Sequence, residues 1–191
     1  MQPLPLQEWN ESLKDVLDDM NGKPLNVHQL MANHPELLKA WWNYRNYSVN
    51  GGDLEQRDCE LVILRVAVKM RCWYEWASHV DRGQLSGLSL SEIERVLHGS
   101  EAAAWGERDA LLLKAVDELI DERSMSADTQ KNLAEHFTPN QVMDVIAIQG
   151  MYVTLSCMIN TWGLELDSGV QQRLPAQTTW EAFEAAVGTK T

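Results

Sequence analysis

Residues 55–70, EQRDCELVILRVAVKM, decide the fold, together with CWYEWASH at residues 72–79 immediately after them. The first segment is apolar over most of its length, and no part of the chain alternates between apolar and polar residues as a β-strand does. Further segments with helical periodicity, bounded by capping residues, prolines and glycines, lie on both sides. We therefore predict an all-α fold, a single multi-helix bundle domain over residues 1–191.

Capping and breaker residues set the limits of the predicted helices. They give helices over residues 5–20, 26–33, 35–49, 55–70, 72–85, 89–97, 105–122, 126–136, 138–160 and 180–187. The run from 142 to 159 is the longest apolar stretch, but it carries polar residues such as Asp144 and Gln149. We interpret it as a buried helix and not as a membrane span.

The charge pattern limits the kinds of partner that the chain can have. The formal net charge is −12, and the lysines and arginines form no cluster. A nucleic-acid or anionic-membrane partner requires a basic patch, so we expect neither. The first five residues lack the basic and apolar regions of a secretory signal, and three cysteines are too few and odd in number for a disulfide framework. We expect reduced thiols and a cytoplasmic protein.

The helix predicted over residues 55–70 has two chemically different faces. Asp58, Arg65 and Lys69 fall within about 20° of one another at the helical repeat, which predicts a solvated stripe. Glu60 lies on the opposite side, among apolar residues. A carboxylate on a buried face is costly unless it is paired or protonated. Glu60 is therefore a candidate functional group.

The next helix carries three ionisable side chains at helical spacing. Cys72, Glu75 and His79 are three and four residues apart, which predicts that they stack on one face, with Trp76 at its border. A hydrogen bond from Glu75 would hold His79 in one tautomer or stabilise its charged form. Cys72 near the helix start would lie at the positive end of the helix dipole, which favours a thiolate.

These motifs resemble the signature of the carboxymuconolactone decarboxylase/alkyl hydroperoxidase D-like family. The resemblance rests on ELVILRVA at 60–67, CWYEW at 72–76 and His79, followed by GLSLSEI at 87–93 and AVDEL at 115–119. It covers about residues 27–166, with peripheral helical segments at both ends. It implies the hydroperoxidase D-like helix arrangement and a symmetric homo-oligomer, a dimer, trimer or hexamer, with sites close to subunit contacts.

The resemblance also implies roles for individual residues. Glu60, Cys72 and His79 match the glutamate, the first cysteine and the histidine of the hydroperoxidase D pattern, but Glu75 stands where the second cysteine is expected. A two-cysteine peroxidase cycle is therefore not expected. The remaining groups, Glu60, Cys72, Glu75 and His79, are similar to those of the decarboxylase side of the family. That similarity implies a lyase or isomerase that acts on a small carboxylated or carbonyl compound such as a lactone, without cofactor or metal.

Tyr74 and Trp76 are the side chains that we expect near the substrate. Several other interpretations stay open from the sequence alone. Glu75 and His79 would also form a simple helix-stabilising pair, and Cys72 would serve as a small core residue. Glu60 would also pair with Arg71, with Arg45 or with a partner subunit. A thiol peroxidase or oxidoreductase that uses Cys72, and a non-catalytic oligomeric binding protein, are the alternative functions.

Overall fold

The computed structural model describes residues 1–188, and over these residues the chain is helical and contains no strand. The predicted all-α class is confirmed. The α-helices are α1 Lys14–Asp19, α2 Asn26–Met31, α3 Pro35–Asn46, α4 Gln56–Lys69, α5 Trp73–Leu85, α6 Leu90–Val96, α7 Glu107–Asp121, α8 Ala127–Leu133, α9 Pro139–Trp162, α10 Ser168–Gln171 and α11 Trp180–Val187. Two 3-10 turns, η1 Leu6–Glu8 and η2 Glu11–Leu13, precede α1, and a π-helical turn, η3 Tyr47–Gly51, follows α3.

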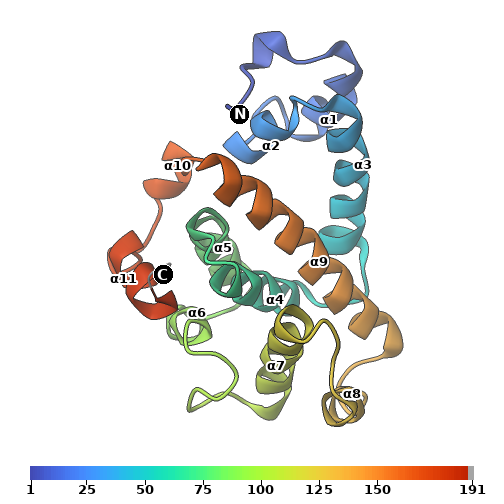
Figure 1. Cartoon of the computed structure of the whole chain (residues 1–191), viewed down its shortest axis with the longest axis vertical. Helices are drawn as coiled ribbons and strands as arrows, with labels where there is room; N and C mark the ends of the chain where they lie inside the picture. The colour runs from blue at the N-terminus through green and yellow to red at the C-terminus, as the bar shows by residue number, and fades with distance from the viewer. Residues whose placement is uncertain (189–191) are drawn as a thin grey trace.

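Helix α4 lies at the centre of the molecule. It packs against α5, α7 and α9, with α1 to α3 at one end of the molecule and α7 and α8 at the other (Figure 1). Its apolar side chains, including Leu61, Val62, Ile63 and Leu64, have no exposed surface. A helix surrounded by other helices is apolar on nearly all sides, which explains the continuous hydrophobic run of this segment.

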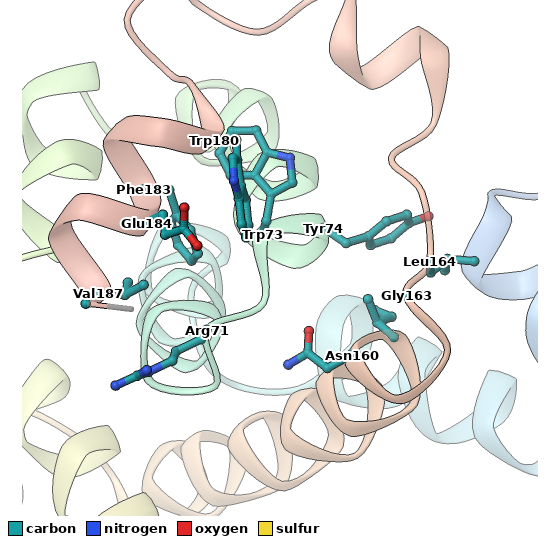
Figure 2. Close-up of a pocket in the computed structure, with 12 residues that line it drawn as sticks. Arg71, Trp73, Tyr74, Asn160, Gly163, Leu164, Trp180, Phe183, Glu184 and Val187 are labelled. Atoms are coloured by element: carbon teal, nitrogen blue, oxygen red, sulfur yellow. The ribbon is translucent and has the colours of Figure 1, made fainter. Parts of the chain in front are cut away.

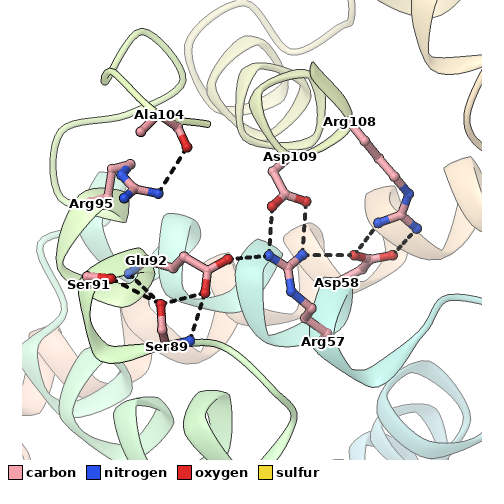
Figure 3. Close-up of polar contacts among 9 residues, drawn as sticks. All are labelled: Arg57, Asp58, Ser89, Ser91, Glu92, Arg95, Ala104, Arg108 and Asp109. Atoms are coloured by element: carbon pink, nitrogen blue, oxygen red, sulfur yellow. Dashed lines mark hydrogen bonds and ion pairs between the residues drawn. The ribbon is translucent and has the colours of Figure 1, made fainter. Parts of the chain in front are cut away.

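The solvated stripe predicted on α4 is wrong. Asp58 is fully buried and Arg65 is 8% exposed, because α7 covers this face and brings charges of its own. Ion pairs at an almost constant sequence offset join the two helices, which therefore run parallel: Arg57–Asp109, Asp58–Arg108, Arg65–Asp117 and Lys69–Asp121. Figure 3 shows the first two of these pairs and Glu92 of α6, which binds the other side of Arg57.

The predicted helix limits differ from the observed ones mainly at the ends of the chain. The segment 5–20 is not one helix, since η1 and η2 precede a short α1. The helix that begins at Pro35 keeps its α-helical form only to Asn46 and continues as the π-helical turn η3. Helix α10 was not predicted, whereas α11 has the expected limits. The central helices α4 and α5 lie within two residues of their predicted ends.

Helix α9 spans the molecule and supports α4. Thr138 and Gln141 form the predicted capping box at its start, and Gly163 ends it in the left-handed conformation with φ of 60°. By length and composition α9 is the one helix of residues 1–188 that would be able to cross a membrane, and 44% of its most apolar window is buried in the fold. The buried Asp144 accepts hydrogen bonds from the backbone N–H groups of Asp53 and Leu54, which fixes the loop before α4.

Candidate active site

The centre of the candidate site is a contact between α4 and α5. The chain turns between these helices at Arg71, whose φ is +50°, so that the two helices lie side by side. Glu60 of α4 and His79 of α5 then meet in the interior, where they are 4% and 2% exposed. Nδ1 of His79 lies 2.6 Å from Oε2 of Glu60. Because a carboxylate only accepts hydrogen bonds, Nδ1 donates its hydrogen and Nε2 carries the free lone pair.

A second acidic group lies on the other side of the imidazole ring. Oε2 of Glu75 and Nη1 of Arg82 are each 3.5 Å from Nε2 of His79. Glu75 is 3% exposed, and burial raises the pKa of its carboxyl group, while His79 and Arg82 act in the opposite direction. The raised pKa favours the neutral acid, which is able to donate a proton. The ring of Tyr152 meets the His79 ring edge to face, with 5.2 Å between their centroids, and so fixes its plane.

The Nε2 edge of His79 faces a small cavity of about 40 Å³. Glu60, which binds Nδ1, is not part of the cavity wall, whereas Glu75 and Arg82, which lie near Nε2, both are. The polar and aromatic lining comprises His28, Trp41, Arg45, Tyr74, Glu75, Ser78, His79, Arg82 and Tyr152. One buried carboxylate therefore holds the imidazole from behind, and the free nitrogen is presented to a cavity.

Comparison with known proteins identifies the family segment. Residues 35–118 match the model of the carboxymuconolactone decarboxylase family. The predicted family resemblance is confirmed. The sequence match is shorter than the predicted core of residues 27–166, and it includes α4, α5 and the site residues. No curated protein matches the chain significantly.

Solved structures extend the likeness over almost the whole chain. A peroxidase-related protein from Ralstonia eutropha JMP134, described as an alkylhydroperoxidase AhpD core, superposes with a TM-score of 0.78 at 19% identity, covering 91% of this chain and 96% of that one. A peroxidase-related protein from Silicibacter sp. TM1040 gives 0.73 at 17% identity, with 94% and 92% covered. The debrominase Bmp8 in complex with 2,3,4-tribromopyrrole gives 0.75 at 11% identity, with 90% and 93% covered. At these identities the likeness concerns the fold.

Cys72 does not join the other predicted site residues. It is the residue before α5, its backbone is extended (φ −103°, ψ 92°), and its side chain does not line the cavity. The predicted stacking of three side chains on one helical face is therefore wrong for Cys72, because the helical repeat begins only at Trp73. The thiol has no exposed surface, and burial raises its pKa to about 12, so a thiolate is disfavoured.

The two predicted substrate-binding aromatics lie in different surroundings. Tyr74 lines the small cavity and also a larger pocket of about 410 Å³ beside α11, and its hydroxyl donates a hydrogen bond to Asp167. Figure 2 shows this larger pocket, with Trp73 and Trp180 above Arg71 and Asn160. Trp76 lines neither the small cavity nor the larger pocket.

The ring of Trp76 is 3% exposed and packs against Phe183 of α11, with 5.7 Å between centroids. The reason is helical phase: Trp73 and Trp76 point to the side of α5 that α11 covers, and both contact Phe183. The side of α5 that bears Glu75 and His79 faces α3 and α9 instead, since their residues complete the cavity wall.

Sequence reasoning missed several side chains of the cavity. Arg82 follows His79 by three residues on the same face of α5, so the helical repeat carried a signal for it. Trp41 and Arg45 come from α3, and no local pattern connects that helix to α5. His28 of α2 lines the cavity and also caps its own helix, since its Nδ1 accepts the backbone N–H of Leu25.

Electrostatically, the cavity is a positive environment. Burial lowers the pKa of His28 to about 3, and the charges of Arg45 and Arg82 add to this effect. Among residues 1–188, no group of three or more His, Cys, Asp or Glu side chains has the arrangement of a metal site. The chemistry that the described groups offer is proton transfer by an oriented imidazole and a carboxyl group whose pKa burial raises.

Proposed function

We propose that this chain is a cofactor-independent acid–base enzyme that moves a proton at a carbon next to a carbonyl or carboxyl group of a small compound. Decarboxylases, lyases and isomerases that act on lactones or related acids use such a step. The observation that carries the proposal is the orientation of His79, whose Nδ1 is bound by Glu60 at 2.6 Å while Nε2 faces the cavity. A positioned acid or base is typically worth about 10²–10⁴-fold in rate.

The proton balance of the step is simple. Nε2 of His79 accepts a proton from the substrate carbon, whose electron pair moves onto the adjoining carbonyl oxygen to form an enolate. The carboxylate of Glu60 stabilises the imidazolium formed. Neutral Glu75 donates its proton to the carbon that is protonated in the product, as the enolate electron pair returns to carbon. The proton on Nε2 then passes to Oε2 of Glu75, 3.5 Å away, which restores both groups.

Thiol chemistry receives less support from the same residues. A peroxidase cycle through neighbouring cysteines needs two thiols, and Glu75 occupies the position of the second. The nucleophile in such chemistry is a thiolate, whereas burial raises the pKa of Cys72 to about 12. We therefore assign Cys72 to the packing between α5 and α9 in this proposal.

Hydrogen–deuterium exchange tests the proposed step without a known product. The protein would be incubated in D₂O with a panel of small keto acids, lactones and dicarboxylic acids, and proton NMR would follow loss of the signal next to the carbonyl. We expect at least one compound to exchange, and both His79→Asn and Glu60→Gln to slow that exchange by about 10² or more. His136→Asn changes an exposed histidine far from the cavity and is the matched control. Unchanged exchange in His79→Asn would remove the proposal.

We also propose that the protein acts in the cytoplasm as a homo-oligomer, with a small molecule as its substrate. Exposed apolar side chains on neighbouring parts of α9 and α3 support an oligomer: Met143 is 68% exposed, Ile146 45% and Tyr44 43%. The side chain of Tyr44, a residue of α3, lies against α9, because its hydroxyl donates a hydrogen bond to the carbonyl of Ala147. Light scattering after size exclusion gives the oligomeric state, and Ile146→Glu is expected to shift it toward the monomer.

A further inference from the structure

The cavity beside His79 contains two guanidinium groups without a carboxylate partner. Among residues 1–188, Arg45 donates only to the amide oxygen of Asn46, and it stacks over Trp42 at 5.4 Å. Arg82 makes one side-chain hydrogen bond, with Nε2 of His79 at 3.5 Å. The arginines of the α4–α7 interface differ, because each of them binds at least one aspartate. The arginines that join α4 to α7 are therefore paired with carboxylates, whereas the two arginines of the cavity wall are not.

A partly buried cation with no carboxylate within ion-pair distance is unfavourable, so the presence of two such cations here requires an explanation. Burial lowers the pKa of Arg45; Tyr152 and Glu60 act in the opposite direction, and Arg82 lowers it further. Removing a charge from water costs several kcal/mol unless an opposite charge compensates for it. The only carboxyl group in the cavity wall is Glu75, whose own pKa is raised by burial, so its neutral form is favoured. The cavity wall thus provides two guanidinium groups and no carboxylate bound to either of them, since Glu60 lies behind His79 and forms its ion pair there.

Two uncharged polar groups in the same wall also lack partners. Four buried side-chain polar atoms of the described chain have no hydrogen-bond partner, and two of them, Nε1 of Trp41 and Oγ of Ser78, belong to this cavity. An indole N–H is only a donor, so the missing partner of Trp41 must be an acceptor. Buried polar groups are normally satisfied, and those that are not commonly await a ligand or water.

The unsatisfied groups and the size of the cavity indicate the same ligand. Guanidinium groups, an indole N–H and a neutral carboxylic acid are all donors, and such a set is complementary to an oxyanion. About 10–15 Å³ of such space holds one water, so the 40 Å³ cavity has room for a group the size of a carboxylate. The remainder of a ligand would extend past the half-buried His28 and Trp41, where the cavity approaches the surface.

We infer that Arg45, Arg82 and the indole N–H of Trp41 form a carboxylate-binding site beside His79, and that the substrate is a small carboxylic acid. This inference rests on the proposed function for its consequence in catalysis. Because Nη1 of Arg82 lies 3.5 Å from Nε2 of His79, a carboxylate bound to Arg82 presents its own α-carbon to the imidazole. The reacting carbon is therefore the one bonded directly to the carboxylate, and Arg45 and Arg82 are positioning residues.

Acetate is a suitable probe, because it carries the carboxylate and little else. In ¹⁵N-labelled protein, we expect added acetate to shift the indole N–H signal of Trp41, which Trp41→Phe identifies by its loss. Acetamide has the same shape without the charge and is expected to cause no shift at equal concentration. Arg45→Met is expected to weaken acetate binding tenfold or more, while Arg123→Met, at an exposed arginine, leaves it unchanged. Equal shifts with acetate and acetamide, or none with either, would overturn the inference.

Stability measurements exclude misfolding as the cause of a weakened site. Arg45→Met removes a partly buried charge that has no carboxylate partner, so its melting temperature is expected to equal or exceed that of the wild type. His79→Asn separates the two proposals, since it is expected to slow deuterium exchange by about 10² or more and to keep acetate binding. Acetate binding without exchange in any compound would contradict the proposed function and support the site. Exchange that proceeds normally in Arg45→Met would contradict the site and support the function.

Discussion

The ion pair between Asp58 and Arg108 predicts that its two ends contribute unequally to stability. The guanidinium group of Arg108 binds both carboxylate oxygens of Asp58, and the Asp58 side chain has no exposed surface, whereas that of Arg108 is 34% exposed (Figure 3). After loss of Asp58, Arg108 is able to turn toward water. After loss of Arg108, Asp58 stays buried with Arg57 as its nearest cation, 3.8 Å away.

The expected magnitudes follow from this asymmetry. Breaking a buried pair costs about 3–5 kcal/mol when an uncompensated charge remains, so we expect Arg108→Met to lower the free energy of unfolding by about 4 kcal/mol. Methionine also preserves apolar contact with Phe137, over whose ring the guanidinium lies. For Asp58→Asn we expect about 2 kcal/mol, a cost typical of a lost buried hydrogen-bonded group whose partner can be resolvated. At about 2–4 °C per kcal/mol for a chain of this size, the melting temperatures fall by about 8–16 °C and 4–8 °C.

Urea unfolding followed by circular dichroism measures both free energies, and differential scanning fluorimetry measures the melting temperatures. Asp18→Asn is the control, since Asp18 and Lys14 form an exposed pair, and its effect is expected to stay within about 0.5 kcal/mol. The double variant Asp58→Asn/Arg108→Met should cost less than the sum of the single variants, because neither unpaired charge is left. A larger loss in Asp58→Asn than in Arg108→Met would refute the reasoning.

Two further predictions concern Glu75 and the cysteines. Burial raises the pKa of Glu75 in the folded chain, so folding takes up a proton between the ordinary value of 4.5 and the raised one, and stability falls as the pH rises through that window. The Glu75→Gln side chain cannot ionise, so the free energy of unfolding of this variant should match that of the wild type below pH 4.5 and exceed it at neutral pH. The exposed control Glu11→Gln should show no such dependence on pH. A difference between Glu75→Gln and the wild type that is constant at all pH values would contradict this prediction. A chromogenic disulfide reagent should label only the exposed Cys157 in the native protein, since Cys59 and Cys72 are buried thiols with pKa values raised to about 12; rapid labelling of Cys72 would favour thiol chemistry instead.

The sequence predicted the central helices because their signals are local. An apolar run, a capping box at Thr138 and a proline at the first helical position each act within one or two turns. The helical repeat of α4 predicted the wrong exposure for Asp58 and Arg65 because it, too, is a local signal. Periodicity reports which side chains share a face, and it contains no information about the charges that another helix brings to that face. Asp58 and Arg65 are buried because α7 supplies Arg108 and Asp117 at matching positions.

The residues of the candidate site likewise differ in whether the local sequence carries a signal for them. Glu60 and His79 stood out because an ionisable group among apolar neighbours is anomalous within its own helix, and the structure joins them. The prediction that Cys72 shares a helical face with Glu75 and His79 was wrong because Cys72 is the residue before α5, so the helical repeat does not apply to it. Arg45 and Trp41 gave no signal at all. Their contribution depends on how α3 packs against α5, which is a long-range contact that single-sequence periodicity does not encode.

The arginines of the α4–α7 interface and those of the cavity wall differ in their partners, and the contrast locates the site. Along the α4–α7 interface the arginines have carboxylate partners, so these charges stabilise the packing of two helices. In the cavity, Arg45 and Arg82 have none, and Glu75 has its pKa raised. Hydrophobic residues in these positions would give a more stable bundle. Charge without a carboxylate partner in a cavity wall lowers stability there, and such a cost is expected where a ligand supplies the missing charge.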